Sequence, residues 1–336
     1  MRPGPYVVGI DLGGTKTMAT VYDAEFQPLA SRMKRTLPHE GFEACVRRIA
    51  SSVKQALNRA AVEISDVAAI GIGSPGSLDL DEGVILDAPN LGWTNAPLAA
   101  VLRSLFDCPV VLGNDVDMGV YAENCFGAAR GSRCVIGVFP GTGIGGGCVY
   151  EGRILRGSRG SCMEIGHVPV MPDGPECGCG QTGCLEAIAS RLAIASAAAR
   201  AAHCGQAPYL MKHAGTAISR IRTPMIAKAV RHGDVVVERI VRRAARAIGL
   251  AIAGAIHMLS PDTVILGGGL VEAMPELFLS EVEAVARDRV LPSFRAGFKV
   301  VKTELGSGAA ALGAAAWARE ITKERFVPAG SREAAV

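Results

Sequence analysis

The sequence predicts an α/β protein built from two related domains, and three observations support this prediction. A glycine-rich turn between two strand-like segments occurs twice, near residue 11 and again near residue 141. Apolar strand-like runs alternate with segments of helical spacing along most of the 336 residues, as in α/β folds. Hydrophobic residues make up 49% of the chain, which supplies a packed core and excludes intrinsic disorder.

The first half of the chain alternates strands and helices. Apolar runs bounded by Gly, Pro or Asn predict strands at residues 6–11, 17–22, 67–73 and 110–112. Apolar side chains three to four residues apart predict a helix over residues 42–61, and another helix follows Asp115 through residue 126.

The second half repeats the pattern of strand, glycine turn and strand. Strands are expected at residues 134–139, 148–150 and 263–266. Helices are expected at residues 185–202, at residues 235–259 and from residue 307. We therefore expect a smaller N-terminal domain, residues 1–113, joined by the C-terminal helix 307–325, and a larger domain, residues 114–306, which carries a cysteine-rich loop.

Two glycine-rich turns are candidate phosphate-binding loops. The first, residues 11–16, has the sequence Asp-Leu-Gly-Gly-Thr-Lys, and the second, residues 141–147, has Gly-Thr-Gly-Ile-Gly-Gly-Gly. Glycines leave backbone N–H groups open to an anion, and Thr15 and Lys16 add a donor and a positive charge. Either turn alone could be an ordinary hairpin turn, since the P-loop spacing is missing. Two such turns, each after a buried strand, favour a nucleotide held between two domains.

Asn114 and Asp115 follow a short buried strand and begin a helix. An aspartate in this place could cap the helix by accepting a backbone N–H. Alternatively, it could act as a general base at the mouth of a cleft, with Asn114 beside it as a hydrogen-bonding group. The residues alone leave both interpretations open.

The cysteine-rich segment predicts a zinc site. Cys177, Cys179 and Cys184 lie within eight residues, and His167 precedes the first of them by ten. Three thiols and one imidazole are the ligands of a closed tetrahedral zinc site, which is structural rather than catalytic. The alternative is a loop of free thiols. The remaining cysteines lie in apolar or scattered settings, and we expect them to be small core residues.

Two acidic residues flank this segment. Glu164 precedes His167 by three residues, and Glu186 follows Cys184 by two. A bound metal would hold both carboxylates near one point, where they and Asp115 could accept hydrogen bonds from the hydroxyls of a polyol. Each glutamate alone could equally be a solvated surface residue.

Together these motifs resemble those of the ROK family, which comprises repressors, open reading frames and sugar kinases. The resemblance follows the family order from residue 11 to residue 186, and Leu266-Gly267-Gly268-Gly269 extends it. It rests on residues 11–16, 89–93, 114–115, 141–147, 164–167 and 177–186. The cysteine segment together with Glu164-Ile165-Gly166-His167 is its most specific part. One departure is Val116-Asp117-Met118, where many relatives have small residues; it concerns helix packing more than chemistry.

The resemblance implies an actin-like ATPase (ribonuclease H-like) fold of two α/β domains, with ATP and sugar in a cleft between them. It implies that Asp115 is the catalytic base. Sugar contacts are expected from Asn90, Asn114, Asp115, Glu164, His167 and Glu186. ATP and phosphate contacts are expected from Asp11, Gly13, Gly14, Thr15, Lys16, Gly141, Thr142, Gly143, Gly145 and Gly268. The metal ligands would be His167, Cys177, Cys179 and Cys184, so that the two ring nitrogens of His167 serve zinc and sugar.

The activity that the resemblance implies is that of an ATP-dependent hexose kinase with Mg²⁺ and a structural Zn²⁺. We expect a glucokinase that phosphorylates the 6-hydroxyl of glucose. The alternatives are a kinase for N-acetylmannosamine, N-acetylglucosamine, mannose, fructose or allose, with polyphosphate as another conceivable donor, and a non-catalytic sugar-sensing regulator. Asp11 lies too early for the helix-turn-helix module that precedes the family's repressors. A homodimer or homotetramer is also expected from the resemblance.

Charge and hydropathy argue against nucleic acid and membrane partners. The 35 Lys and Arg residues against 32 Asp and Glu leave a net charge of +3, which is too balanced to attract either. The longest apolar stretches, such as residues 247–256, are far shorter than the roughly 20 residues that span a bilayer. The N-terminus has no signal-peptide pattern, so we expect a cytoplasmic protein.

Overall fold

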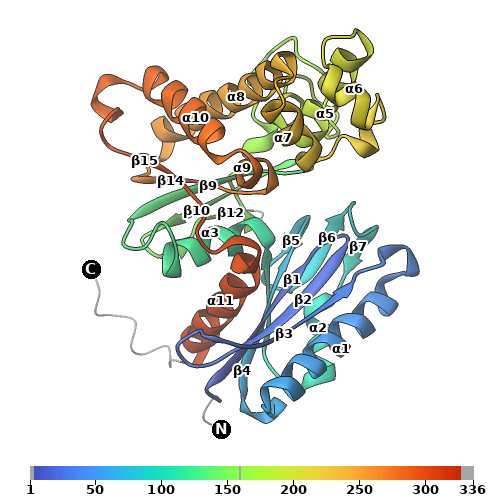
Figure 1. Ribbon diagram of the computed structural model, residues 1–336. Coiled ribbons are helices and arrows are strands. Elements are labelled where there is room, and N and C mark those ends of the chain that lie inside the picture. The colour runs from blue at the N-terminus through green and yellow to red at the C-terminus, as the bar shows by residue number, and fades with distance from the viewer. Residues whose placement is uncertain (1–3, 159, 327–336) are drawn as a thin grey trace. The chain divides into compact units, whose positions relative to one another are not determined.

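A computed structural model describes residues 4–158 and 160–326, and the chain divides into two compact units (Figure 1). The described residues of the first unit lie within Met1–Arg130, Gly152–Cys162 and Leu305–Val336, and those of the second within Gly131–Glu151 and Met163–Glu304. The sequence placed a boundary after residue 113, whereas the first unit by this division also includes the helix that begins at Asp115.

The first unit is built on a five-stranded mixed sheet of order β3-β2-β1-β4-β8. Its strands are β1 (Tyr6–Leu12), β2 (Lys16–Tyr22), β3 (Pro28–Arg35), β4 (Val67–Ser74) and β8 (Val110–Asn114). The first three form an antiparallel meander, whereas β1, β4 and β8 are parallel neighbours. The carboxyl ends of β1, β4 and β8 therefore meet at one edge of the sheet.

Helices cover both faces of this sheet. Figure 1 shows α1 (Phe42–Ala60) and α2 (Leu98–Phe106) on one face and α11 (Ala309–Phe326) on the other. The larger hydrophobic core lies under α1 and α2, and small side chains of α11 pack on Val7, Tyr22 and Ala69. Gly71 permits this close packing, because a Cβ there would overlap the carbonyl oxygen of Ala314 in α11.

The remaining elements of the first unit are short strands and one helix. A small antiparallel sheet contains β5 (Ser77–Asp79), β6 (Val84–Ala88) and β7 (Trp93–Ala96). Residues 152–162 contribute β11 (Arg153–Ile154), β12 (Arg156–Gly157) and β13 (Gly160–Ser161). The helix α3 (Asp115–Phe126) carries Glu123, whose buried carboxylate accepts the backbone N–H groups of Ala128 and Leu305, each at 2.9 Å.

The second unit repeats this strand arrangement. β10 (Ile144–Tyr150) is antiparallel to β9 (Cys134–Pro140), which is parallel to β14 (Thr263–Leu266), which in turn is parallel to β15 (Lys299–Lys302). The order and directions β10-β9-β14-β15 match those of β2-β1-β4-β8 in the first unit. The internal repeat predicted from the two glycine turns is therefore confirmed.

The helices of the second unit differ from the prediction at residues 185–202. They are α4 (Leu185–Ala189), α5 (Arg191–His203), α6 (Pro208–Ala214), α7 (Thr223–Arg231), α8 (Val235–Leu259), α9 (Gly269–Ala273) and α10 (Pro275–Arg289). The single helix predicted at residues 185–202 is wrong, because the chain breaks at Ser190 between α4 and α5. The Ser190 side chain accepts the N–H of Ala193 and so caps α5.

Short 3₁₀ turns connect several of these elements. They are Pro38–Glu40, Ile64–Asp66, Ile165–His167, Ile218–Arg220, Pro292–Phe294 and Gly306–Gly308. Among the described residues, no helix is both long enough and apolar enough to cross a bilayer.

Candidate functional site

Two carboxylates lie at the carboxyl edge of the first sheet. Asp11 is opposite Gly73 near the end of β1 and β4, and Asp115 directly follows Asn114, the last residue of β8. Since β4 alone separates β1 from β8, these strands lie about 10 Å apart at their carboxyl ends. The strand order therefore brings together two acids that are about a hundred residues apart in the sequence.

Asn114, rather than Asp115, caps the helix α3. The Oδ1 atom of Asn114 accepts the N–H groups of Val116, at 2.9 Å, and Asp117, at 3.3 Å. Asp115 occupies the first helical position, where one of its oxygens also accepts the N–H of Val116 at 2.9 Å. The structure thus assigns the capping role to Asn114 and leaves Asp115 with a second carboxylate oxygen for another partner.

The environment of Asp115 favours its protonated form. Burial raises the pKa of the Asp115 carboxyl to about 6, and the negative charge of Asp11 adds to this rise. Burial also raises the pKa of Asp11, although the nearby Lys16 ammonium counteracts the effect. A carboxylate with a pKa near 6 is still ionised at pH 7 and is a stronger base than an ordinary aspartate.

The first glycine turn presents backbone N–H groups that no other part of the described chain uses. The turn is closed by a hydrogen bond from Gly13 N–H to the Lys16 carbonyl, at 3.0 Å. The Thr36 hydroxyl donates a second hydrogen bond to the Gly13 carbonyl, at 2.6 Å. Among the described residues, the N–H groups of Gly14 and Thr15 have no acceptor. This turn joins β1 to β2, so the hairpin interpretation is correct, and its open donors still suit an anion.

Asn90 lies beside this first turn. It occupies the turn between β6 and β7, and its carbonyl oxygen is 3.0 Å from the position that a Cβ on Gly14 would take. The structure therefore brings one predicted sugar contact and one predicted phosphate contact of the first unit next to each other.

The second glycine turn has the same character as the first. Gly141 N–H donates to the Gly143 carbonyl at 2.8 Å, and no acceptor within the described ranges engages the N–H groups of Thr142 and Gly143. The turn is shorter than predicted because β10 already begins at Ile144. Gly268 lies against it, since a Cβ on Gly268 would be 2.8 Å from the Pro140 carbonyl oxygen.

Glu186 connects this second turn to the cysteine-rich loop. It belongs to α4, which begins directly after Cys184, and its Oε2 atom accepts the N–H of Ile144 at 2.8 Å. A Cβ on Gly143 would overlap the same carboxylate oxygen. One oxygen of Glu186 is therefore committed to the turn, and the other has no hydrogen-bond partner among the residues that the structure describes.

The sequence analysis missed Arg191, which also contacts the second turn. Its guanidinium Nη2 donates to Thr142 Oγ1 at 3.1 Å, and its backbone N–H donates to the Gly141 carbonyl at 2.9 Å. The only indication in the sequence is that a basic residue follows shortly after the cysteine motif. With residues 185–202 predicted as one continuous helix, nothing distinguished Arg191 from the other residues of that helix.

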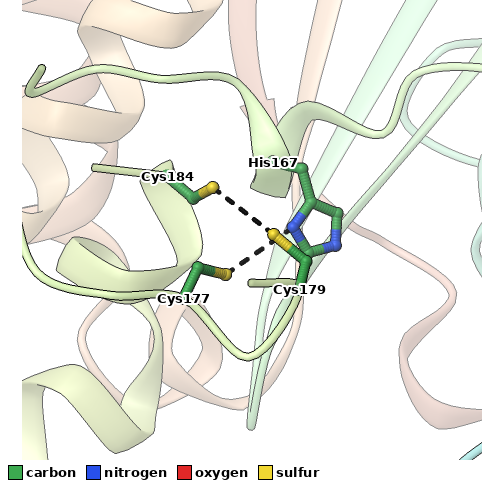
Figure 2. A group of neighbouring side chains, drawn as sticks. All are labelled: His167, Cys177, Cys179 and Cys184. Carbon is green, nitrogen blue, oxygen red and sulfur yellow. Dashed lines mark hydrogen bonds between the residues drawn. The ribbon is translucent and has the colours of Figure 1, made fainter. Parts of the chain in front are cut away.

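His167, Cys177, Cys179 and Cys184 converge on one point (Figure 2). Their ligand atoms all lie within 4.8 Å of one another. Cys179 Sγ is 3.7 Å from Cys184 Sγ, and Cys177 Sγ is 3.8 Å from His167 Nδ1. Zinc–sulfur bonds of about 2.3 Å at tetrahedral angles place two sulfurs about 3.8 Å apart, so these distances suit one tetrahedral metal ion.

The backbone around this cluster holds His167 against β10. Leu185 N–H donates to the Val168 carbonyl at 2.9 Å, and the turn Ile165–His167 packs directly on Ile144, because Gly166 has no Cβ to overlap the Ile144 carbonyl. Figure 2 shows His167 Nδ1 toward the cysteine sulfurs and the other ring nitrogen away from them. Glu164 is exposed and precedes the same turn.

Each unit thus gathers its own share of the predicted residues. The first unit holds Asp11, Gly13, Gly14, Thr15, Lys16, Asn90, Asn114 and Asp115. The second unit holds Gly141, Thr142, Gly143, Gly145, Glu164, His167, Cys177, Cys179, Cys184, Glu186 and Gly268.

The chain is similar to sugar kinases over nearly its whole length. The model of the ROK family matches residues 7–321. A glucokinase of Thermotoga maritima is 37% identical over 324 residues, which cover 95% of this chain and 98% of the relative.

Two solved structures share the fold. A ROK family glucokinase from Streptomyces griseus, in complex with glucose and AMPPNP, is 33% identical, has a TM-score of 0.80, and matches 94% of this chain and 99% of its own. A ROK hexokinase from Thermus thermophilus is 35% identical, has a TM-score of 0.81, and matches 95% of this chain and 99% of its own. The predicted actin-like α/β fold is confirmed.

Proposed function

Because the chain belongs to the ROK family, we propose that it is an ATP-dependent hexose kinase that phosphorylates the 6-hydroxyl of glucose. The observation that carries this proposal is Asp115, a carboxylate with a raised pKa that Asn114 frees from the capping role. The glucokinases among its relatives support glucose as the acceptor.

In the proposed reaction, Asp115 accepts the proton of the sugar 6-hydroxyl. The oxygen then forms a bond to the γ-phosphorus of ATP, and the bond from that phosphorus to the bridging oxygen of ADP breaks. The products are glucose 6-phosphate, ADP and a proton, which passes from Asp115 to solvent. The raised pKa suits Asp115 to this step, because a base works best when its pKa lies near the working pH.

We assign the two glycine turns to the phosphate groups of ATP. The open N–H groups of Gly14, Thr15, Thr142 and Gly143 supply donors, and Lys16 supplies positive charge. Mg²⁺ bound with the triphosphate supplies further charge neutralisation, and Asp11 is the acidic side chain that would hold it through water.

We assign sugar recognition to five polar side chains. The first two are Asn90 and Asn114. The others are Glu164, Glu186 and His167, whose ring nitrogen that faces away from the thiols would contact the sugar. Carboxylates accept hydrogen bonds from sugar hydroxyls and so select both their presence and their direction.

We propose zinc as the ion held by His167, Cys177, Cys179 and Cys184. The soft donor set and the tetrahedral spacing of the ligand atoms support this choice. Such a site leaves no open position for water, so its role would be to hold Glu186 and His167 in place.

A coupled assay of ADP release over a panel of hexoses tests the proposed function. We expect glucose to give the highest kcat/KM, with mannose, fructose, allose and the N-acetylated hexosamines lower, and ATP to be a better donor than polyphosphate. No sugar-dependent ADP release in metal-replete protein would overturn the proposal in favour of a sugar-sensing role. A higher kcat/KM for another hexose would correct only the substrate.

Two further expectations accompany this function, namely a homodimer or homotetramer and a cytoplasmic location. Sedimentation velocity at several protein concentrations would test the first, and fractionation of the source cells the second.

A further inference from the structure

Arg191 contacts two consecutive residues of the second glycine turn from a single position. Its guanidinium donates to Thr142 Oγ1 at 3.1 Å, and its own N–H donates to the Gly141 carbonyl at 2.9 Å. It can do so because Ser190 ends α4 and caps α5, which makes Arg191 the first residue of the new helix. The break between α4 and α5 therefore places the positively charged side chain of Arg191 next to the second glycine turn.

The hydrogen bond from Arg191 fixes the role of the Thr142 hydroxyl. A guanidinium only donates, whereas a hydroxyl has two acceptor lone pairs and a single proton to give. Since Thr142 Oγ1 accepts from Arg191, its proton remains to be donated to another group. With the open N–H groups of Thr142 and Gly143, the turn then offers three neighbouring donors to an anion.

Among the residues that the structure describes, no acidic side chain neutralises the charge of Arg191. Its guanidinium forms no ion pair with any carboxylate of the described chain. By contrast, Arg242 and Arg246 of the same unit share Glu281. The positive charge of an arginine without an ion-pair partner, next to three unused donors, strengthens the hydrogen bonds that these donors make to a phosphate oxygen.

We propose that Arg191 is a positioning residue for nucleotide binding. It holds the Thr142 hydroxyl so that this group donates a hydrogen bond to a phosphate of the nucleotide. The proposal rests on the proposed kinase function, because it takes the second turn as a phosphate site. It adds to that function a residue outside both the glycine turns and the cysteine-rich loop.

Calorimetric titration with ADP and Mg²⁺ tests the proposal without any sugar. We expect Arg191→Ala to weaken ADP binding about tenfold or more, as for the loss of a hydrogen bond to a charged group. Arg191→Lys should restore part of the affinity, because an ammonium can donate to Thr142 but cannot reproduce the guanidinium geometry. Arg200→Ala, an exposed position on the same helix α5, is the matched control and should leave ADP affinity and melting temperature unchanged.

A double-mutant cycle identifies the route of the effect. If Arg191 acts through Thr142, the pair Arg191→Ala and Thr142→Ala should weaken ADP binding much less than the product of the two single effects. In steady-state assays, the KM for ATP should rise in Arg191→Ala while the KM for the sugar stays within about twofold. Fully multiplicative single effects would overturn the route through Thr142.

The outcomes separate the inference from the function on which it rests. A wild-type protein that binds ADP, with the same affinity in Arg191→Ala, would overturn the role of Arg191 and leave the kinase proposal standing. A wild-type protein that binds neither ADP nor AMPPNP would overturn both.

Discussion

At the scale of single residues, the carboxylate of Asp115, the proposed base, has a cost in stability. Burial and the neighbouring charge of Asp11 raise its pKa to about 6, so ionising it in the folded state is harder than in the unfolded chain. Its contribution to stability is thus present below pH 4 and is lost as the pH rises through 6. At neutral pH the ionised carboxylate destabilises the fold by roughly 1–3 kcal/mol.

We predict that Asp115→Asn lowers kcat by about 10²- to 10⁴-fold, the contribution of a positioned base. The same change should raise the melting temperature at pH 8 but not at pH 4, because only the ionised carboxylate is destabilising. Steady-state kinetics and thermal melts at both pH values check this. A variant that kept more than about a tenth of the wild-type kcat would contradict the assignment of the base.

The pH dependence of the reaction should report the pKa of Asp115. We expect kcat/KM to fall below about pH 6, because the protonated carboxyl cannot accept the proton of the sugar hydroxyl. Asp11→Asn removes a neighbouring negative charge, so it should move this acid limb to lower pH while it reduces the plateau. An acid limb that stays in place would show that Asp11 does not influence Asp115.

At the scale of elements, Glu186 makes α4 and the second glycine turn depend on each other. We predict that Glu186→Gln raises the KM for the sugar about 10- to 150-fold, while its amide oxygen still accepts the N–H of Ile144. Glu186→Ala removes that acceptor as well and should raise the KM for ATP too. Kinetics with each substrate varied distinguish the two variants.

A change in the second glycine turn provides the control for this prediction. Gly143→Ala should displace the Glu186 carboxylate from Ile144, because the added Cβ occupies the place of Oε2. Its effect on ATP should therefore resemble that of Glu186→Ala. If Glu186→Ala left the KM for ATP unchanged, the contact with Ile144 would have no role in nucleotide binding.

The cysteine-rich loop gives a prediction about metal. We expect one zinc ion per chain by elemental analysis, and Cys179→Ser should lower the zinc content, the melting temperature and the sugar affinity together. Cys204→Ser, an exposed thiol outside the cluster, is the control and should change none of them. Freshly purified protein without metal, yet with the same melting temperature after chelation, would refute the site.

The elements show where the sequence was a sufficient guide and where it was not. Long apolar runs and the glycine turns gave β1, β4, β9 and β14 to within about a residue, because burial dictates such patterns. The break at Ser190 escaped, since a single serine among alanines fits a helix interior by spacing and becomes a cap only through its bond to Ala193. Strands as short as β5 to β7 carry too few residues for a period.

The same reasoning explains the candidate site. The cysteine cluster could be predicted because its ligands are near in sequence. The acids at the sheet edge could be predicted because Asp11 lies near the end of one strand and Asp115 directly follows another. Arg191 could not, since its contact with Thr142 depends on how α5 begins. Hydrogen bonds between segments that are distant in the sequence produce no regular residue spacing from which they could be predicted.

At the scale of the whole molecule, Glu123 ties together two distant segments of the first unit. We predict that Glu123→Ala lowers the free energy of unfolding by about 2–5 kcal/mol, because the N–H groups of Ala128 and Leu305 lose a charged acceptor. Glu123→Gln keeps one acceptor oxygen and should cost less. Denaturant unfolding of both variants checks this, and equal losses would mean that charge alone matters.

The first unit is discontinuous in the chain, and this has a consequence for its biosynthesis. Its sheet begins at Tyr6, whereas the helix that covers one face of β1 and β4 begins only at Ala309. At roughly 5–20 residues per second, a ribosome takes about 15–60 s to pass from one to the other. During that interval Val7, Tyr22 and Ala69 lack the helix that covers them, so we expect a nascent chain stalled before Ala309 to aggregate more readily than the full chain.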